Sequence, residues 1–272
     1  MIRCLEAENI DFILGSLLES LKAEHQLEII LVATGAPIMS TVNHLSIKII
    51  ISNAKRIEAK KIGVRYSKYD KILFLDSDQV VGENLLEELS NVKEDMAFIP
   101  ERSYNRNFIG KLMDKKRLEV EKKMKKKLSL GLPVVPRCFD RSLLVKCFDS
   151  LPPGVVKNVT ESEDSIIFYE CLKYSKSIKW VNSFIYNYDP NIKIFLRKSF
   201  IYGLRNENAI VSNLLTPEYI RAIRHFQRQF ILNNGSLSFG ILIFNILRGI
   251  PYIIGTTIAR IKRKGLKNEN RI

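Results

Sequence analysis

The chain has 272 residues, 46% of them hydrophobic, which is enough for a buried core and excludes a disordered basic tail. The formal net charge of +14 favours polyanionic partners such as nucleic acid, anionic lipid or phosphorylated substrates. The four cysteines form no C-x-x-C pair and have no histidine at metal-ligand spacing, which argues against a cysteine- or histidine-based metal site and for free, mostly buried thiols in a reducing compartment.

The first hundred residues alternate between helical and strand-like patterns. Two continuous apolar runs, 27–33 and 47–51, predict strands that are buried on both faces. The helix predicted over 55–67 is expected to carry its lysines and arginines on an outer face. The other predicted helices are 9–23 and 83–89, and the other predicted strands are 71–75 and 96–100. This alternation predicts an α/β layer with a mostly parallel sheet, in which ligands bind beyond the carboxyl ends of the strands.

The second half of the chain predicts further helices and strands and then a helical extension. The predicted elements are helices at 108–128, 141–148 and 162–174, strands at 134–139 and 178–188, a turn at 152–154, and helix from 192 onward. The first eight residues lack the basic start and apolar core of a signal peptide. We therefore expect an α/β unit over residues 1–210 and a helical, apolar and basic extension over 211–272.

An acidic turn closes the third predicted strand, where K-I-L-F-L runs into D-S-D. In a turn at a strand end, Asp76 and Asp78 can aim both carboxylates at one small volume. Two hard oxygen ligands suit Mg²⁺ or Mn²⁺, with a diphosphate completing the shell and the metal neutralising its charge as it departs. The alternative is that Ser77 or Asp78 is the N-cap of a following helix.

Several segments, in the same order along the chain, resemble the GT-A glycosyltransferases of family 2. They are E-A-E-N-I at 6–10, L-E-I-I-L-V at 27–32, K-I-L-F-L-D-S-D at 71–78, I-P-E at 99–101, P-R-C-F-D-R at 136–141, T-E-S-E-D-S at 160–165 and F-L-R-K-S-F-I-Y-G at 195–203. The resemblance covers about residues 3–210. It implies a GT-A (Rossmann-like) fold, with a mixed, mostly parallel sheet and helices on both faces.

The resemblance also implies roles for single residues. Asp164, the second residue of the E-D motif, would be the base that takes the acceptor hydroxyl's proton during inverting transfer, with Glu163 beside it. Asp76 and Asp78 would bind the metal and, with Arg137, the nucleotide-diphosphate sugar. The alternative for Glu163 and Asp164 is that they only favour a helix N-terminus electrostatically.

Three basic residues are candidate contacts for a diphosphate or for an acceptor phosphate, namely Arg137, Arg197 and Lys198. A guanidinium group pairs with phosphate through two parallel hydrogen bonds, which makes the arginines suited to this task. The alternative for each of the three residues is a solvated surface charge.

The chain departs from the family pattern at three places. It begins at about the end of the family's first strand, at Ile2–Cys4, from which we expect the true start to lie upstream. The segment 33–38 reads A-T-G-A-P-I where members often carry D-x-G-S-x-D, whose first aspartate contacts the nucleotide base. Tyr186-Asn187-Tyr188 stands where many members have a histidine. These departures leave open a catalytically weak, GT-A-like pseudoenzyme.

Two further segments point toward a membrane. The lysine-rich run 111–127 is either a solvated helix or a polybasic face on anionic lipid. The run 237–259 is long and apolar enough for a transmembrane helix. Arg248 and a polar stripe along that run favour a helix or hairpin in the interface instead. A core helix of a soluble protein is the alternative.

The sequence therefore predicts an inverting, metal-dependent glycosyltransferase at the cytoplasmic face of the cell membrane. It would move a sugar from a nucleotide-diphosphate donor to a hydroxyl of a lipid-linked glycan or a polysaccharide precursor. A basic α/β module that binds nucleic acid is the rival class. The sequence contains no basic stripe with exposed aromatics and no groove-reading helix, so nucleic acid is not expected as a partner.

Overall fold

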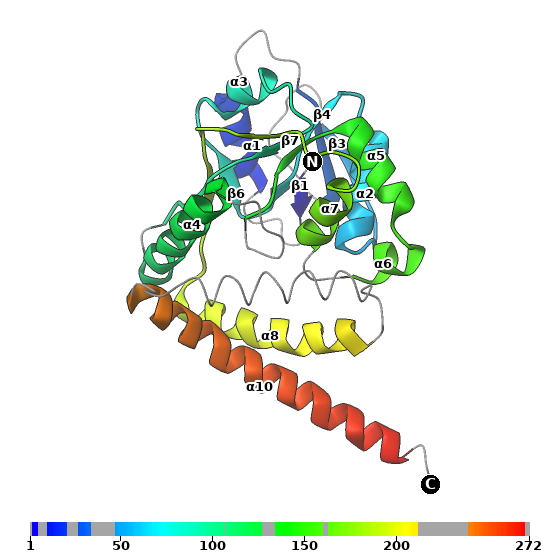
Figure 1. Cartoon of the computed structure of the whole chain (residues 1–272), viewed down its shortest axis with the longest axis vertical. Helices are drawn as coiled ribbons and strands as arrows, with labels where there is room; N and C mark the ends of the chain where they lie inside the picture. Colours follow the sequence, from blue (N-terminus) through cyan, green and yellow to red (C-terminus); the bar gives the residue numbers. More distant parts are fainter. Residues whose placement is uncertain are drawn as a thin grey trace.

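The computed structural model describes residues 2–4, 10–20, 27–33, 47–105, 107–126, 134–159, 163–211 and 239–269. Figure 1 shows an α/β body, with strands at its centre and helices around them. Two long helices, α8 and α10, run side by side beneath this body.

Four parallel strands in the order β3–β2–β1–β5 form the first sheet. Their bounds are Ile2–Cys4 (β1), Ile29–Ala33 (β2), Ile47–Ile51 (β3) and Leu75–Asp76 (β5). Strand β2 is buried throughout, and its alternate residues pack on opposite faces of the sheet. Leu31 lies in a cluster with residues of helices α1 and α3, and Val32 in a cluster with residues of α2. Helices therefore cover both faces of this sheet, as predicted.

The edge strand β3 corrects one prediction. The run 47–51 was expected to be buried on both faces, but Ile49 is 42% and Ile51 57% exposed. Strand β3 lies at the end of the sheet and pairs only with β2 among the described strands. An apolar run alone does not distinguish a central strand from an edge strand.

Two further groups of strands continue the body, in the orders β10–β7–β9–β4 and β6–β11–β8. Pairs β10–β7 and β11–β8 are parallel, whereas β7–β9, β9–β4 and β11–β6 are antiparallel. The bounds are Lys71–Leu73 (β4), Gln79–Val81 (β6), Met96–Phe98 (β7), Glu101–Ser103 (β8), Cys138–Asp140 (β9), Ile178–Trp180 (β10) and Ile185–Asn187 (β11). The predicted strands 71–75 and 178–188 are each split into two, because each passes from one group to the next.

The predicted helices are present, and α6 is an additional one. The bounds of the helices are Ile10–Glu19 (α1), Arg56–Tyr66 (α2), Leu85–Ser90 (α3), Phe108–Lys126 (α4), Arg141–Ser150 (α5), Pro153–Asn158 (α6), Glu163–Cys171 (α7), Ile192–Val211 (α8) and Phe239–Glu269 (α10). The turn predicted at 152–154 is wrong, since Pro153 begins α6. Proline suits the first turn of a helix because the N–H that it lacks would have no helical partner there.

Helices α8 and α10 approach each other to backbone contact, because glycines lie between them. A Cβ atom added at Gly203 would lie 2.1 Å from the carbonyl oxygen of Tyr252, and one at Gly255 would lie 2.3 Å from that of Phe200. Helix α10 also packs on α4. The predicted boundary after residue 210 falls at the last residue of α8, although α8 packs along α10.

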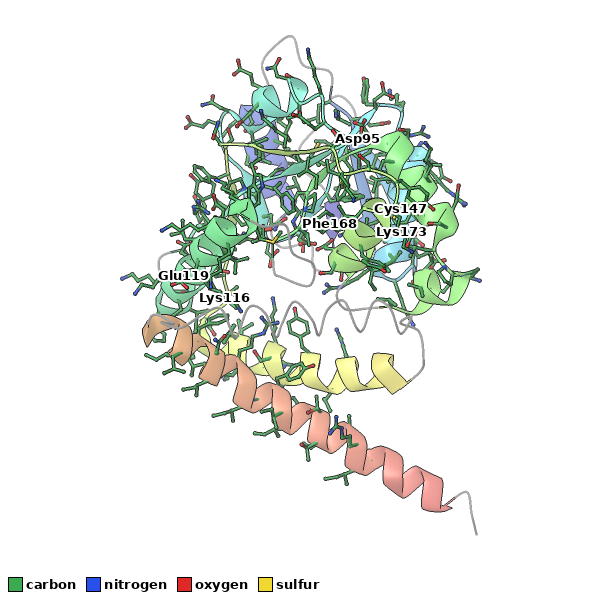
Figure 2. All side chains as sticks on the ribbon, viewed as in Figure 1. Asp95, Lys116, Glu119, Cys147, Phe168 and Lys173 are labelled. Atoms are coloured by element: carbon green, nitrogen blue, oxygen red, sulfur yellow. The ribbon has the colours of Figure 1, made fainter. Side chains whose placement is uncertain are left out.

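The cysteines with described side chains are free and buried, as expected, and they are Cys138, Cys147 and Cys171. Figure 2 shows Cys147 among the helices on one side of the body. Burial raises the pKa of Cys138 to about 12, so this thiol stays protonated and unreactive at neutral pH.

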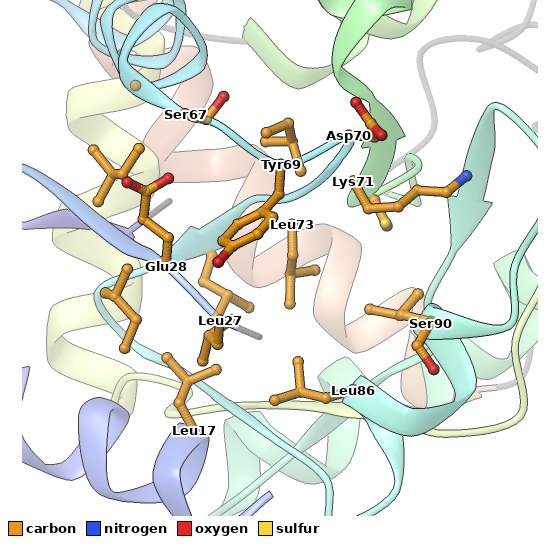
Figure 3. A pocket seen from close by; sticks show the side chains of 17 residues that line it. Leu17, Leu27, Glu28, Ser67, Tyr69, Asp70, Lys71, Leu73, Leu86 and Ser90 are labelled. Carbon is orange, nitrogen blue, oxygen red and sulfur yellow. The ribbon is translucent and has the colours of Figure 1, made fainter. Parts of the chain in front are cut away.

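A cavity of about 320 Å³ lies at the amino-terminal side of β2 and β4 (Figure 3). Leu17, Leu27 and Leu86 are among its mainly apolar lining. Strand β1 pairs with β2 only from Leu31 onward, so no described strand lies against the first residues of β2 on that side. The cavity is at the opposite end of the strands from the acidic turn, and we do not assign it to the candidate site.

Candidate active site

The acidic turn lies at the carboxyl end of β5 and leads directly into β6. The N–H of Asp76 donates a hydrogen bond to Oε1 of Gln79 (2.9 Å), and the N–H of Tyr188 donates to the carbonyl oxygen of Asp78 (2.8 Å). These bonds tie the turn to its own following strand and to the segment after β11. The next helix, α3, begins only after β6, so the alternative that Ser77 or Asp78 caps a helix is wrong.

The carboxylates of the turn share one negatively charged volume. Burial, and then the charge of Asp76, raise the pKa of Asp78, while Lys198 of α8 and Arg137 act in the opposite direction. Lys198 is therefore close enough to act on this volume, and both Lys198 and its neighbour Arg197 are exposed. In the described part of the chain no group of three or more Asp, Glu, His or Cys could hold a metal ion. A divalent ion at the turn would need further oxygen ligands from a bound substrate or from water.

Arg137 is held by its backbone between two strands. Its N–H donates to the carbonyl oxygen of Ala97 (3.0 Å), and its carbonyl oxygen accepts from the N–H of Phe74 (2.8 Å). The residue is 7% exposed. A side chain that is anchored and buried in this way presents its guanidinium group in one direction.

The Arg137 guanidinium joins three carboxylates. Its Nη1 lies 3.2 Å from Oδ2 of Asp76 and 3.3 Å from Oδ2 of Asp164, and its Nη2 lies 3.0 Å from Oε1 of Glu101. Burial opposes the charge on Arg137, but Asp164, Glu101 and Asp76 together raise its pKa well above the usual value. The acidic turn and the E-D motif are thus brought together at one cation.

The E-D motif begins helix α7 and is paired with two basic residues of α2. Nη1 of Arg56 lies 2.8 Å from Oε1 of Glu163, and Nζ of Lys60 donates to Oδ1 of Asp164. Burial would raise the pKa of Asp164, but Lys60 and Arg137 lower it well below its usual value. Burial and the neighbouring Asp164 raise the pKa of Glu163. Asp164 is therefore an ionised acceptor at neutral pH.

The burial of Lys60 corrects the prediction that α2 carries its basic residues on an outer face. Lys60 is only 3% exposed, and it lies between Ile57 and Val64 on the apolar face of the helix. This position, three residues after one buried residue and four before the other, was a signal in the sequence for an inward-facing lysine. We missed both Lys60 and Arg56 as site residues.

Two amide side chains, those of Asn187 and Gln79, connect Glu101 to the acidic turn through hydrogen bonds. Nδ2 of Asn187 donates to Oε2 of Glu101 (3.2 Å), and Nε2 of Gln79 donates to Oδ1 of Asn187 (2.9 Å). Gln79 also accepts the N–H of Asp76, so the hydrogen bonds return to the acidic turn. Asn187 thus links the turn to Glu101. Neither Gln79 nor Asn187 was predicted, since isolated amides carry no pattern. Residues 34–38, the other departure from the family, lie outside the described residues.

The sequence matches no family model and no curated protein. Solved structures of S. aureus TarS residues 1–349 are similar to this chain. The first has 14% identity and a TM-score of 0.52, and the match covers 94% of this chain and 79% of that one. The complex with UDP-GlcNAc has 14% identity and a TM-score of 0.53, with 86% and 73% covered. The complex with UDP has 12% identity and a TM-score of 0.51, with 97% and 90% covered. This likeness shows a glycosyltransferase fold of the GT-A type.

Proposed function

We propose that the chain is an inverting, metal-dependent glycosyltransferase that moves a sugar from a nucleotide-diphosphate donor to a hydroxyl group. The observation that carries the proposal is the pairing of Asp76 and Asp164 with the one guanidinium of Arg137. It brings a carboxylate suited to a metal–diphosphate complex next to a carboxylate suited to accept a proton. A transferase needs these two tasks performed on neighbouring substrates.

The fold comparison supports a nucleotide-sugar donor. Two of the similar TarS structures hold UDP or UDP-GlcNAc. Membership of family 2 is part of the same proposal, and the donor panel below identifies the sugar and the nucleotide.

The donor set of the acidic turn fits a hard divalent cation. Asp78 and Asp76 would hold Mg²⁺ or Mn²⁺ together with the donor's diphosphate, because their mutual repulsion favours a cation and carboxylate oxygen is its preferred ligand. When bound, the ion supplies neutralisation of the charge that builds on the departing diphosphate. Arg137 and Lys198 are the basic residues near enough to contribute phosphate contacts from the protein itself.

Asp164 is the proposed general base. Its carboxylate accepts the proton of the acceptor hydroxyl as the new glycosidic bond forms, and Glu163 beside it is held in its ion pair with Arg56. Lys60 and Arg137 lower the pKa of Asp164, so its carboxyl group is ionised before the reaction. Because the pKa of Asp164 is low, its carboxylate accepts the proton only late in the reaction. By then the bond between the sugar and the acceptor oxygen has largely formed, and the hydroxyl proton has become acidic.

The exposed face of α10 supports a site of action at a membrane, which we propose to be the cytoplasmic face of the cell membrane. Among the described helices, the segment Leu242–Lys262 is long and apolar enough to cross a membrane. Its large exposed residues recur at helical spacing and form one apolar row, namely Leu242, Ile246, Ile250, Ile253, Ile254 and Ile261. We propose that this row lies in the interface of an anionic membrane, from which a lipid-linked glycan or polysaccharide precursor would be reached.

Two basic residues lie near the contact of α10 with α4, which involves the buried Phe244 and not the exposed row. Nζ of Lys116 lies 4.4 Å from the ring centre of Phe244, where α4 meets α10 (Figure 2). Burial and the nearby Arg248 lower the pKa of Lys116 to about 7. Lys116 is therefore sheltered between α4 and α10, and the membrane proposal rests on the apolar row.

The test is a panel of nucleotide-diphosphate sugars, scored by thermal shift and by donor hydrolysis with and without Mn²⁺. We expect one donor to raise Tm only when Mn²⁺ is present and to be turned over. Equal turnover in EDTA would overturn the metal dependence, and the absence of any donor effect would overturn the function.

A catalytically weak GT-A-like protein is the second candidate. The pairing of Asp164 with two cations favours it, because a carboxylate that is neutralised from two sides is a poor base. Metal-dependent binding of a donor without hydrolysis or transfer would support this candidate over the enzyme.

A further inference from the structure

Helix α2 presents two cations, one helical turn apart, to two adjacent carboxylates. Arg56 pairs with Glu163 at 2.8 Å, and Lys60 pairs with Asp164. Arg56 and Lys60 are four residues apart and therefore lie on the same side of α2. The pair of bridges fixes the first turn of α7 against α2.

The Lys60 side chain is rigid because it is buried along its length. Its side chain is 4% exposed, and its Nζ lies 5.1 Å from the ring centre of Phe74. Phe74 is in the core and packs on Phe139 with ring centres 5.7 Å apart. The side chain of Lys60 is therefore held in the protein interior, and its ammonium group reaches Asp164 in one position.

The two oxygens of Asp164 are held by different elements. Oδ1 accepts from Lys60 of α2, and Oδ2 accepts from Arg137, which precedes β9. Arg137 also contacts Asp76 on the side of the acidic turn, whereas the ion pair that Lys60 forms among the described residues is with Asp164. Arg137 therefore contacts both Asp164 and the donor side of the site, whereas Lys60 contacts Asp164.

We infer that Lys60 is the positioning residue of Asp164, which holds Oδ1 in place so that the carboxylate meets the acceptor hydroxyl in one orientation. The inference rests on the proposed function. When a diphosphate binds Arg137, the guanidinium group divides its hydrogen bonds between the donor and Oδ2 of Asp164, so its interaction with Oδ2 weakens. Lys60 is on the other side of Asp164, and its ion pair keeps the carboxylate oriented while Oδ2 becomes the oxygen that takes the proton.

Three variants of the full chain test this role. Lys60→Met keeps an unbranched apolar stem against Phe74 but removes the ammonium group. Lys60→Arg keeps a cation. Lys61→Met makes the same change on the next residue of α2, whose Nζ instead lies 2.9 Å from the carbonyl oxygen of Phe148.

Lys60→Met is expected to lower kcat for transfer by about 100-fold with little change in the donor KM, because misplacing a reacting group by about 1 Å costs about that much. Lys60→Arg is expected to recover most of the rate, and Lys61→Met to behave as wild type. A raised donor KM with unchanged kcat in Lys60→Met would overturn the inference and make Lys60 a donor contact.

A measurement without substrate separates this inference from the proposed function. Tm is measured for wild type, Lys60→Met, Asp164→Asn and the double variant. If the ion pair is formed, the double variant loses less than the sum of the two single losses. Additive losses would overturn the inference even in an active enzyme. Sub-additive losses in a protein that turns over no donor would overturn the function and retain the pairing.

Discussion

Asp76 and Asp164 accept hydrogen bonds from the same nitrogen, Nη1 of Arg137, at 3.2 and 3.3 Å. One carboxylate belongs to the turn after β5 and the other to the first turn of α7. A ligand that draws Arg137 away changes the electrostatic surroundings of both carboxylates at once. Donor binding and the basicity of Asp164 are therefore coupled in the proposed site.

Asp78→Asn is expected to lower metal-dependent kcat/KM by at least about 100-fold, which is about 2.7 kcal/mol of transition-state stabilisation. The fold should keep its Tm or gain slightly, because burial disfavours the charge that is removed. Transfer in Mn²⁺ and thermal melting measure the two effects. Wild-type turnover in a well-folded Asp76→Asn/Asp78→Asn protein would contradict the metal site.

Asp164→Asn is expected to slow transfer by about 10²–10⁴-fold while donor affinity stays near wild type, because loss of a general base acts on the chemical step. Donor titration by thermal shift and single-turnover transfer separate binding from chemistry. If donor binding were lost and the transfer rate kept, Asp164 would belong to the donor site, and Glu163 would become the candidate base.

Asp164 should also make stability depend on pH. Its folded pKa lies below the unfolded value of about 3.9, so its ionised form stabilises the fold. That contribution is complete above about pH 5 and is lost as pH falls through 3.9 toward the folded pKa. We expect the difference in unfolding free energy between wild type and Asp164→Asn, measured in urea, to shrink from pH 7 to pH 3. Glu163 and Asp78, with raised pKa values, act in the opposite sense but are present in both proteins. A difference independent of pH would count against the ion pairs of Asp164.

Ile253→Asp is expected to reduce flotation with anionic liposomes and to leave Tm unchanged. Ile253 is 62% exposed in the apolar row of α10, so the new charge meets lipid rather than the protein core. Asn245→Asp adds the same charge to another exposed position of α10 and is the matched control. Equal loss of flotation in both variants would show that charge, and not the apolar row, decides binding.

Gly203→Ala should destabilise the contact of α8 with α10 by about 1–3 kcal/mol, as overpacking does in a close-packed interface. The new Cβ would meet the carbonyl oxygen of Tyr252 at 2.1 Å. Gly249→Ala on α10 is the control, since a Cβ there has nothing within 4 Å. That control should gain about 0.5–1 kcal/mol from lower backbone entropy in the unfolded chain. Similar Tm changes in the two variants would contradict the close approach.

The sequence predicted the parts of the site that follow from local pattern. A buried strand that ends in D-S-D puts Asp76 and Asp78 at a sheet edge whatever the rest of the fold does. The alternation of elements predicted the layer order, and the apolar positions of 9–23 predicted α1. The bounds of the split strands were missed. A strand that passes from one sheet to the next does so because of the strands it pairs with, and these partners cannot be identified from the local sequence pattern.

Long-range pairs were beyond the reach of the sequence. Lys60 meets Asp164, and Arg137 meets Asp76, only after several strands and helices have packed, so no spacing in the chain encodes either contact. Asn187 and Gln79 were missed for the same reason. Arg137 was expected to contact a diphosphate, and its ion pairs with Asp76 and Asp164 are a finding of the fold.

Strand β1 has a consequence for how the chain folds. Ile2 pairs with Leu31 on one side and with Leu75 on the other. Strand β1 is therefore paired on both sides only after residues far along the chain have formed β2 and β5. Such non-local parallel pairing slows folding, because the entropy of closing long loops is lost before the pairing gains anything. Until this pairing forms, the edges of β2 and β5 that face β1 are open to other chains, which raises the risk of aggregation during folding.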